Sequence, residues 1–280
     1  MKRQIKLGIL GAGKMGEALI ARWIATRRLK PREIGVTAAH QSRIRFLEQR
    51  YGVIGFPSNK RLVGSTKTVL LAVKPQEISK VLREVRETIR PGQLWISIAA
   101  GASLASLYKG GIRRAIRAMP NNPLLIGEGV TGLFAPRGLS QRERHFAERL
   151  LKTAGLALWV NREADLDAVT ALSGSGPAYF YTIFDSLIRA GGRLGLNQAV
   201  ACELACRTAI GSARMVLQNG ASPKKLCRAV TSKRGTTEAA LLILKRRSFD
   251  KILQQAVGAA FRRARSIKRE IEKGASHHRG

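Results

Sequence analysis

The stretch Lys6-Leu-Gly-Ile-Leu-Gly-Ala-Gly-Lys-Met-Gly16 decides how the first half of the chain folds. Its apolar start predicts a buried strand, its glycines follow the pattern G-x-G-x-x-G, and residues 17–24 continue with a helical pattern. In such a turn Gly11 permits a tight bend, Gly13 lets the backbone approach a pyrophosphate, and Gly16 lets helix and strand pack closely. The phosphates then rest on the helix N-terminus. The segment therefore predicts a dinucleotide-binding site.

The next predicted strand, residues 33–38, indicates which dinucleotide is bound. An NAD site usually has an Asp or Glu at the end of this strand, where it binds the ribose hydroxyls. This sequence reads Thr37-Ala-Ala-His-Gln-Ser-Arg43 and has no acidic residue there. Arg43, His40 and Ser42 are suited to a 2′-phosphate, so NADPH is the predicted cofactor and NADH the alternative. The competing interpretation is that Arg43 merely lies in the first turn of a helix that Ser42 caps.

Further apolar runs predict the rest of a Rossmann-like, mostly parallel sheet with helices on both faces. Ligands of such sheets bind at the carboxyl ends of the strands, where this chain places small residues and Lys74-Pro-Gln76. A helix that follows the sequence Ser140-Gln-Arg-Glu143 is predicted to begin with a capping box. The remaining strands are predicted at residues 68–73, 94–100, 114–119, 131–135 and 156–160.

The strand pattern stops near residue 162, and almost everything after it has helical periodicity. We therefore predict two domains, a nucleotide-binding domain at 1–162 and an all-helical domain at 163–280. The long predicted helix 198–218 carries small and apolar residues on more than one face. Such a helix is usually buried between other helices or in a subunit interface.

Two segments of the helical half place small or hydroxyl-bearing residues where a helix is predicted to begin. They are Leu172-Ser-Gly-Ser-Gly-Pro-Ala-Tyr179 and Thr231-Ser-Lys-Arg-Gly-Thr-Thr237. Free backbone N–H groups and the positive end of the helix dipole favour an anion at such positions. The two segments therefore predict a cradle for a small carboxylate. Ser175 and Pro177 are expected to start the helix of the first segment.

The chain is strongly basic, with 50 Lys and Arg against 18 Asp and Glu and a net charge of +32. This charge is compatible with nucleic-acid binding, with attraction of an anionic substrate and cofactor, or with a general surface bias. Aromatic residues make up only 5% of the chain and do not interleave with the basic runs, which disfavours a stacking platform for single strands. A surface bias without a specific nucleic-acid partner is the favoured interpretation.

Composition excludes several other classes of protein. No apolar run reaches the roughly 18 residues of a membrane helix, and the basic start Met1-Lys-Arg-Gln4 leads directly into a strand, so we expect a cytoplasmic protein and no membrane partner. Three cysteines are an odd number, and Cys202 and Cys206 lie one helical turn apart, which favours reduced thiols. No histidine lies at ligand spacing from them, so no metal site is predicted.

Taken together, the motifs resemble those of the pyrroline-5-carboxylate reductase family, which catalyses the last step of proline synthesis. The resemblance covers essentially the whole chain. It implies an N-terminal nucleotide-binding domain, a C-terminal helical dimerisation domain, substrate bound where the two meet, and a homodimer or a higher oligomer built from dimers. It rests on Gly11-Ala-Gly-Lys-Met-Gly-Glu-Ala-Leu19, Ala72-Val-Lys-Pro75, Ser97-Ile-Ala-Ala-Gly101, Arg117-Ala-Met-Pro-Asn121, Asp167-Ala-Val-Thr-Ala-Leu-Ser-Gly-Ser-Gly-Pro-Ala-Tyr179 and residues 231–237.

The resemblance also assigns site residues. It implies that Thr237 places its hydroxyl near the ring nitrogen of the substrate, which makes Thr237 the candidate catalytic residue. The implied substrate contacts are Ser232, Gly235, Thr236 and Thr237. The implied cofactor contacts are Gly11, Ala12, Gly13, Lys14, Met15, Ser42, Arg43, Asn59 and, at the nicotinamide end, Ala72, Val73, Lys74 and Pro75.

The implied reaction suits these residue types. A hydride passes from C4 of NADPH to C5 of a cyclic imine, and an iminium that already carries its proton needs no strong acid. Orientation of two reactants can lower a barrier by several kcal/mol, up to about 7–11 in the best model systems. This explains why no His, Cys or carboxylate stands out as a catalyst. The alternative role of Thr237 is that of a hydroxyl that satisfies backbone donors at a helix start.

The sequence departs from the family at the predicted substrate loop. Lys233 and Arg234 stand where the family usually has proline and glycine. If that glycine has a positive φ, Arg234 costs on the order of 1 kcal/mol there. Alternatively, the two cations attract the substrate carboxylate. Asn122, where threonine is commoner, is a milder change near the nicotinamide.

Two rival functions are compatible with parts of the sequence. A β-hydroxyacid dehydrogenase also joins a Rossmann domain to a helical one, but it needs a general-acid lysine on a helix near the junction. The predicted helix at 178–189 contains no lysine. The second rival, from a different class, is a basic nucleic-acid-binding protein on a dehydrogenase scaffold.

Overall fold

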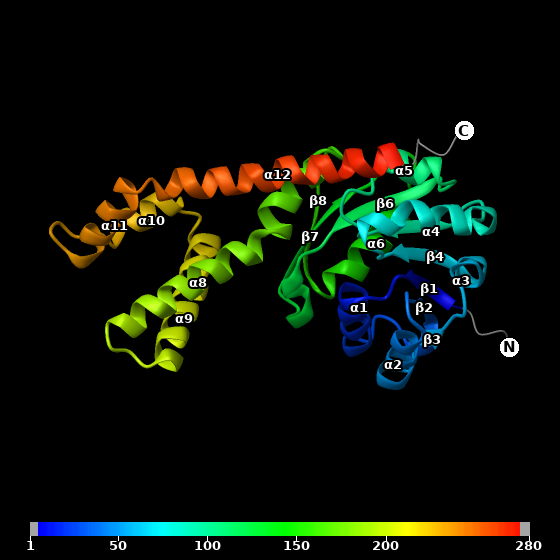
Figure 1. Ribbon diagram of the computed structural model, residues 1–280, viewed down its shortest axis with the longest axis horizontal. Coiled ribbons are helices and arrows are strands. Elements are labelled where there is room, and N and C mark those ends of the chain that lie inside the picture. The colour runs from blue at the N-terminus through cyan, green and yellow to red at the C-terminus, as the bar shows by residue number, and fades with distance from the viewer. Residues whose placement is uncertain (1–4, 275–280) are drawn as a thin grey trace. The chain divides into compact units, whose positions relative to one another are not determined.

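The computed structural model describes residues 5–274 of the chain. The chain divides into two compact units (Figure 1). Unit 1 comprises Met1–Ser175 and Ala260–Gly280, and unit 2 comprises Gly176–Ala259. The predicted boundary at residue 162 separates strand-rich from helical sequence, and it stays a prediction. No helix among the described residues is long and apolar enough to cross a membrane.

Unit 1 is built on one sheet. Its described strands are β1 (Ile5–Leu10), β2 (Ile34–Thr37), β3 (Ile54–Gly55), β4 (Thr66–Leu71), β5 (Leu94–Ser97), β6 (Arg114–Met119), β7 (Gly129–Phe134) and β8 (Gly155–Trp159). They lie in the order β3-β2-β1-β4-β5-β6-β7-β8 (Figure 1). All neighbours run parallel except β6 and β7. The first six positions follow the order of a doubly wound dinucleotide-binding sheet, which confirms the predicted fold class.

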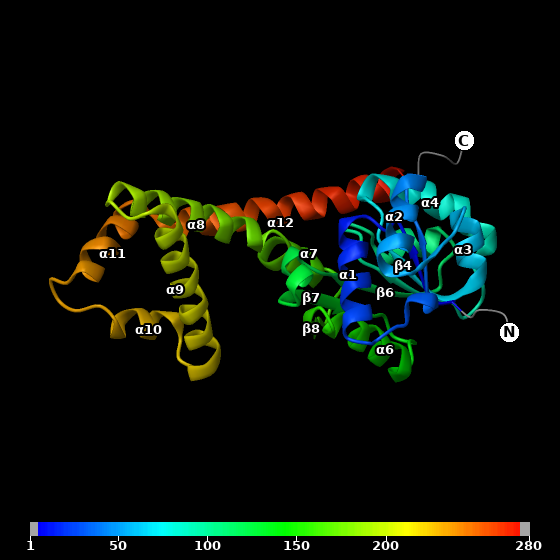
Figure 2. The same ribbon diagram turned by 90° about the horizontal axis from the view of Figure 1, so that it is seen from below.

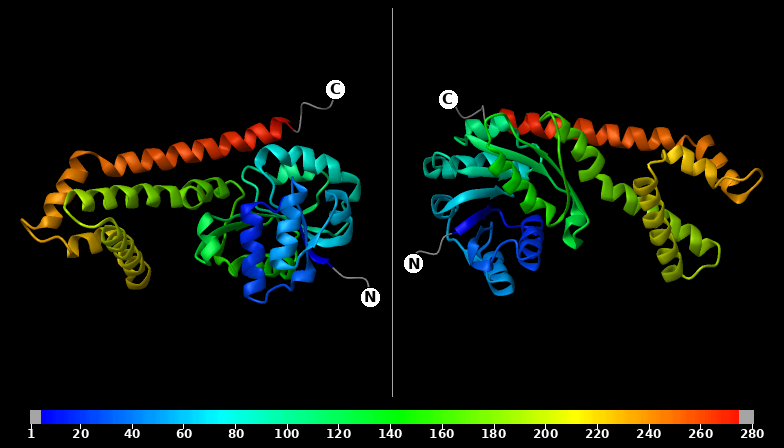
Figure 3. Two further views of the ribbon diagram at one scale, coloured as in Figure 1. Left: turned by 60° about the horizontal axis from the view of Figure 1, so that its bottom comes forward. Right: turned by 180° about the vertical axis from the view of Figure 1, so that it is seen from behind.

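Helices cover both faces of this sheet (Figures 1 and 3). They are α1 (Lys14–Ala25), α2 (Gln41–Tyr51), α3 (Asn59–Ser65), α4 (Ile78–Val85), α5 (Leu104–Lys109), α6 (Gln141–Lys152), α7 (Asp165–Val169) and the last part of α12 (Phe249–Gly274). Leu70 of β4 packs in a core with α1, α2 and α6, whereas Leu71 packs in a second core with α3, α4 and α5. Each fully buried side chain of this kind contributes about 1.5–3 kcal/mol. The unbroken apolar runs of the sequence follow from this two-sided burial.

Two predicted strands extend past the observed strand ends. The runs at 68–73 and 94–100 were expected to be strands throughout, but β4 ends at Leu71 and β5 at Ser97. The amide of Ala72 still donates to the carbonyl of Leu10, and that of Ile98 to Leu71, after which the ladder stops. The residues beyond it form the rim of the sheet.

The predicted capping box of α6 is confirmed. The Ser140 hydroxyl accepts from the Glu143 amide, and the Glu143 carboxylate accepts from the Ser140 amide. The guanidinium of Arg114 on β6 also donates to both carboxylate oxygens of Glu143. The hydrogen bond from Arg114 is the main reason that the pKa of Glu143 falls from its ordinary 4.5 to about 2, against the effect of burial.

Replacement of Glu143 by glutamine is expected to destabilise the protein in a pH-dependent way. Because the folded-state pKa is lowered, the stabilisation is fully present above about pH 4.5 and is lost as the pH falls towards 2. We expect a loss of about 1–2 kcal/mol near neutral pH, with solvent screening taken into account. Denaturant unfolding across a pH series measures this, with exposed Glu87→Gln as the control. If the difference in free energy of unfolding between Glu143→Gln and the unaltered protein stays constant down to about pH 2, the predicted role of Glu143 is wrong.

Helix α8 (Gly176–Arg193) begins where segment 172–179 predicts a helix, with Pro177 in its first turn, but Ser175 is not a free N-cap residue. After α7 the chain passes through a π-helical turn, Thr170–Gly174, and Ser175 keeps helical angles of φ −83° and ψ −17°. The Ser175 amide donates to the Thr170 carbonyl at 2.8 Å, the bond of a π turn. A Cβ on Gly174 would lie 2.9 Å from the Cε atom of Met119, so this glycine permits close packing on β6. Sequence periodicity missed the turn because one inserted residue leaves both flanking helical patterns intact.

Unit 2 consists of helices (Figure 2), and these leave much apolar surface exposed. It contains α8 (Gly176–Arg193), α9 (Gln198–Asn219), α10 (Pro223–Ala229), α11 (Thr236–Arg246) and the first part of α12. Helices α8 and α9 pack closely, since a Cβ on Gly191 would meet that of Ala201 at 2.8 Å. Exposed apolar side chains include Phe180, Leu187, Val200, Leu204, Ile210, Leu217, Leu242, Ile243 and Ile252. A surface of this kind marks a protein–protein interface.

Candidate active site

The glycine turn after β1 has the geometry that a dinucleotide site requires. Gly11 has φ +80°, and its amide and that of Ala12 both donate to the carbonyl of Thr37 at the end of β2. A Cβ on Gly11 would lie 2.5 Å from Cγ1 and 3.0 Å from Cα of Val73. Only glycine therefore fits this position. The turn delivers the chain directly into the first residues of α1.

The space next to Gly13 is open towards the N-terminus of α1. A Cβ on Gly13 would meet no described atom closer than the Gly11 carbonyl oxygen, at 3.9 Å. Gly13 is the N-cap residue, and no side chain caps the helix. The first amides of α1 can therefore donate to a phosphate, so this turn fits a pyrophosphate. At Gly16, by contrast, a Cβ would make ordinary contacts of 3.5–3.6 Å with Ile9 and Ala12, so close packing alone does not require glycine there.

Other predicted cofactor residues lie at the same edge of the sheet. Ala72 and Val73 follow β4 beside Gly11, and exposed Lys74 precedes a short 3₁₀ turn that begins at Pro75. Asn59, the first residue of α3, accepts a 2.6 Å hydrogen bond from the Thr37 hydroxyl. Its amide nitrogen donates to Glu84 on α4. The structure thus gathers residues 11–15, 59 and 72–75 at the carboxyl ends of β1, β2 and β4.

Arg43 reaches the glycine turn from α2. Its Nε donates to the carbonyl of Ala12 at 3.1 Å and its Nη2 to the carbonyl of Gly13 at 3.2 Å. Nη2 also pairs with the carboxylate of Glu17 at 2.5 Å. Ser42 is exposed in the first turn of α2, but it does not cap the helix, because the N-cap residue is His40 and no side-chain cap bond is present. The structure therefore places Arg43 beside the turn, and Ser42 precedes it on α2 with its side chain exposed.

Glu17 is a residue of this site that the sequence did not reveal. Burial of its carboxylate favours the neutral form, but hydrogen bonds from Arg43 and Tyr51 outweigh this and lower the pKa of Glu17. The Tyr51 hydroxyl donates to Glu17 at 2.9 Å, and Arg50 donates to the Tyr51 hydroxyl at 3.1 Å. The only signal in the sequence was a carboxylate in the first turn of α1, which usually serves the helix dipole alone.

The predicted substrate residues lie together in one turn of unit 2, where α11 begins. Gly235 is the N-cap residue, and its amide donates to the carbonyl of Ser232. A Cβ on Gly235 would lie only 2.3 Å from the Ser232 hydroxyl oxygen. The side chains of Ser232, Thr236 and Thr237 make no hydrogen bond to any described residue. This turn therefore offers three hydroxyls and the first amides of α11 to an anion.

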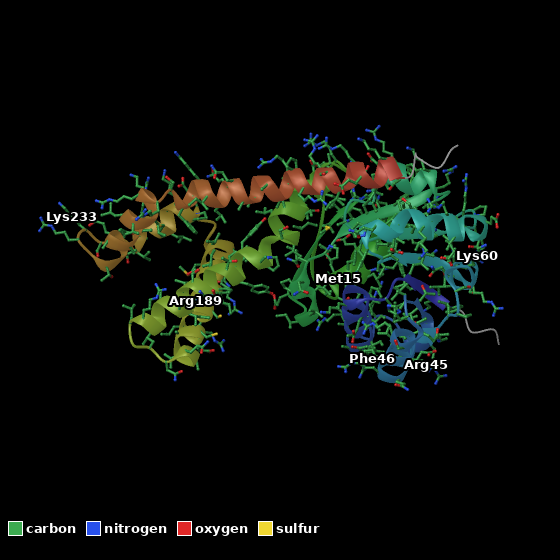
Figure 4. The ribbon with its side chains drawn as sticks, in the orientation of Figure 1. Met15, Arg45, Phe46, Lys60, Arg189 and Lys233 are labelled. Carbon is green, nitrogen blue, oxygen red and sulfur yellow. The ribbon has the colours of Figure 1, made fainter. Side chains whose placement is uncertain are left out.

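Arg234 has the strained backbone that its position predicted. Its φ is +57°, in the left-handed region, and its amide donates to the Glu238 carboxylate at 2.7 Å. The neighbouring Lys233 is exposed on the loop between α10 and α11 (Figure 4). Glu238 thus holds the turn in a conformation that glycine would adopt without cost.

Replacement of Arg234 by glycine is expected to stabilise the protein by up to about 1 kcal/mol, because it removes left-handed strain. Lys233→Gly is the matched control, since Lys233 has no positive φ and its replacement only adds freedom to the unfolded chain. Denaturant unfolding at one fixed protein concentration compares the two variants. If both lose stability equally, the strain at Arg234 is absent in solution.

The glycine turn after β1 and the turn before α11 both lie in segments that match known protein families. Residues 163–267 match the family model described as pyrroline-5-carboxylate reductase dimerisation, and residues 6–101 match the model described as NADP oxidoreductase, coenzyme F420-dependent. The pyrroline-5-carboxylate reductase of Pseudomonas aeruginosa is 36% identical over 278 residues, which covers 95% of this chain and 98% of that protein. The Synechocystis enzyme of the same name is 37% identical over 265 residues, covering 94% and 98%. The crystal structure of Plasmodium falciparum pyrroline carboxylate reductase with NADP bound superimposes with a TM-score of 0.87 at 27% identity, covering 95% and 99%.

Proposed function

The chain belongs to the pyrroline-5-carboxylate reductase family, and we propose that the two clusters described above bind its cofactor and its substrate. The protein is an NADPH-dependent oxidoreductase that reduces the C=N bond of 1-pyrroline-5-carboxylate to give L-proline, the last step of proline biosynthesis. The observation that carries this function is identity of 36% to a reductase of that name over nearly the whole of both chains.

The carboxyl edge of the sheet is proposed to hold NADPH. Residues 11–15 would bind the pyrophosphate through the first amides of α1, where the open space at Gly13 fits it. Ser42 and Arg43 would bind the 2′-phosphate, with Asn59 nearby, and residues 72–75 would line the nicotinamide end. NADPH, when bound, supplies a hydride to the carbon of the C=N bond. The protein's part is to fix the cofactor against β1 and β4.

The turn before α11 is proposed to bind the substrate. Ser232 and Thr236 would donate to the carboxylate through their hydroxyls, together with the amides near Gly235. Thr237 would place its hydroxyl at the ring nitrogen and orient the imine, whose proton is already present on the iminium. Because no acid has to deliver that proton, orientation carries the contribution of these residues.

The protein is a homo-oligomer that associates through its helical dimerisation domain. The exposed apolar side chains of unit 2 are the surface that this association covers. We propose that the protein works in the cytoplasm, because Cys202, Cys206 and Cys227 are all free, and secreted proteins usually pair their cysteines.

An assay with two substrate classes tests this function against its nearest rival. Addition of pyrroline-5-carboxylate to enzyme and NADPH should abolish the absorbance of the reduced nicotinamide. A β-hydroxyacid dehydrogenase would instead reduce NADP⁺ when supplied with 3-hydroxyisobutyrate. Turnover of the hydroxyacid with none of the imine would reject the proposal.

A further inference from the structure

Glu17 on α1 contacts two residues of α2. One is Arg43, the predicted contact of the 2′-phosphate, and the other is Tyr51. The two carboxylate oxygens of Glu17 accept from different partners, Oε2 from Arg43 at 2.5 Å and Oε1 from Tyr51 at 2.9 Å. A second cation, the Nε of Arg50, lies 3.9 Å from Oε1. The side chains of Arg43 and Glu17 are 27% and 22% exposed, so the pair stands at the surface of the cofactor turn.

We propose that Glu17 sets the cofactor preference by engaging Arg43, which lowers the affinity for the 2′-phosphate of NADPH while leaving the affinity for NADH almost unchanged. This inference rests on the proposed function, in which Arg43 contacts that phosphate. Nothing in the sequence pattern of α1 assigns such a role to Glu17.

The donor geometry of Arg43 supports this role. A guanidinium has five N–H donors, and Nε and Nη2 of Arg43 already donate to the carbonyls of Ala12 and Gly13 and to Glu17. Nη1 has no partner among the described residues. Both N–H groups of Nη2 are in use, so a phosphate that binds Nη1 and Nη2 side by side competes with the Glu17 carboxylate and the Gly13 carbonyl for Nη2.

Charge supports the same conclusion. The carboxylate of Glu17 neutralises Arg43 and is itself kept ionised, as its lowered pKa requires. A 2′-phosphate carries about −1.5 to −2 charges near neutral pH, whereas the ribose hydroxyl of NADH carries none. Competition with Glu17 for Arg43 therefore penalises NADPH, which carries the 2′-phosphate, and not NADH.

The ring of Phe46 contacts the guanidinium groups of both Arg43 and Arg50, which lie beside Glu17. The guanidinium carbons of Arg43 and Arg50 lie 5.2 and 5.8 Å from its centroid, and Phe46 projects from α2 (Figure 4). Arg43 is thus held by its stack on Phe46 and by two carbonyls, independently of Glu17. Removal of the carboxylate should leave the guanidinium in place with one more donor available.

The test measures binding of adenosine 2′,5′-bisphosphate and adenosine 5′-monophosphate by calorimetric titration at fixed ionic strength. Glu17→Gln should tighten binding of the bisphosphate by about threefold to tenfold and leave that of the monophosphate within about twofold. Glu17→Ala serves as the second variant should Gln disturb the fold. Glu33→Gln is the control, because Glu33 pairs with Lys6 before β2, at the opposite edge of the sheet.

The same titration in a background without Arg43 decides whether Glu17 acts through it. In Arg43→Ala the bisphosphate should bind more weakly, and the added Glu17→Gln change should have less than half of its former effect. Equal effects in both backgrounds, or weaker bisphosphate binding in Glu17→Gln alone, would overturn the inference. These titrations need no turnover, so absence of pyrroline-5-carboxylate reduction would reject the proposed function and leave them interpretable.

Discussion

Replacement of Thr237 by alanine lowers kcat for pyrroline-5-carboxylate by about 10- to 100-fold and leaves the affinity for NADPH within about twofold. The Thr237 hydroxyl makes no hydrogen bond to a described residue, so its removal breaks no contact inside the chain. The expected loss therefore belongs to the bound substrate, whose ring nitrogen loses its orienting partner. Steady-state kinetics and an NADPH titration measure the two quantities.

Two further variants separate chemistry from folding at Thr237. Thr237→Ser keeps the hydroxyl and should restore most of the rate. Thr182→Ala removes a hydroxyl from α8 that donates to the Ala178 carbonyl, and it should leave kcat unchanged. If Thr237→Ala reacts as fast as the unaltered enzyme, then Thr237 serves only the start of α11 and is no catalytic residue.

Replacement of Gly11 by alanine is expected to have the largest effect on the cofactor site. With φ at +80° and a Cβ position 2.5 Å from Val73 Cγ1, alanine would strain the turn and push it from β4. We expect a loss of about 2–4 kcal/mol in the free energy of unfolding. Because the turn carries the proposed phosphate site, NADPH affinity should fall by about 100-fold or more.

Substitutions at two other glycines separate the loss of NADPH affinity from the loss of stability. Gly13→Ala meets no described atom within 3.9 Å and has φ −74°, so it should fold normally yet bind NADPH weakly. Gly64→Ala on α3 has nothing within 4 Å and should change neither quantity. Denaturant unfolding and fluorescence titration measure stability and affinity for all three. Normal affinity in Gly11→Ala and Gly13→Ala would place the phosphate site elsewhere.

The sheet was predictable because its signals are local. The apolar run before Gly11 and the glycine spacing that ends at Gly16 predict strand, turn and helix start from one short stretch. Strand ends were less predictable, because residues such as Ala72 remain apolar beyond the ladder and donate only one further bond to Leu10. The π turn at 170–174 was missed for a related reason, since helical periodicity cannot reveal a single inserted residue.

In the candidate active site, too, some features were predictable from the sequence and others were not. The strain at Arg234 was predictable from the family resemblance, because the family usually has glycine there and glycine adopts a positive φ easily. The pair of Glu17 and Arg43 was not, because the two residues lie 26 positions apart and their contact depends on how α2 packs beside α1. A charged residue on a helix is usually solvated, and only the fold shows which one is paired.

Measurement of L-proline formed per NADPH oxidised is the most direct test that the protein is a pyrroline-5-carboxylate reductase. The purified protein would be incubated with pyrroline-5-carboxylate and either NADPH or NADH, and the amino acid would be quantified by chiral chromatography. We expect one L-proline for each NADPH oxidised, at a rate that falls in Thr237→Ala. Cofactor oxidation without proline, or no oxidation with either cofactor, would contradict this function.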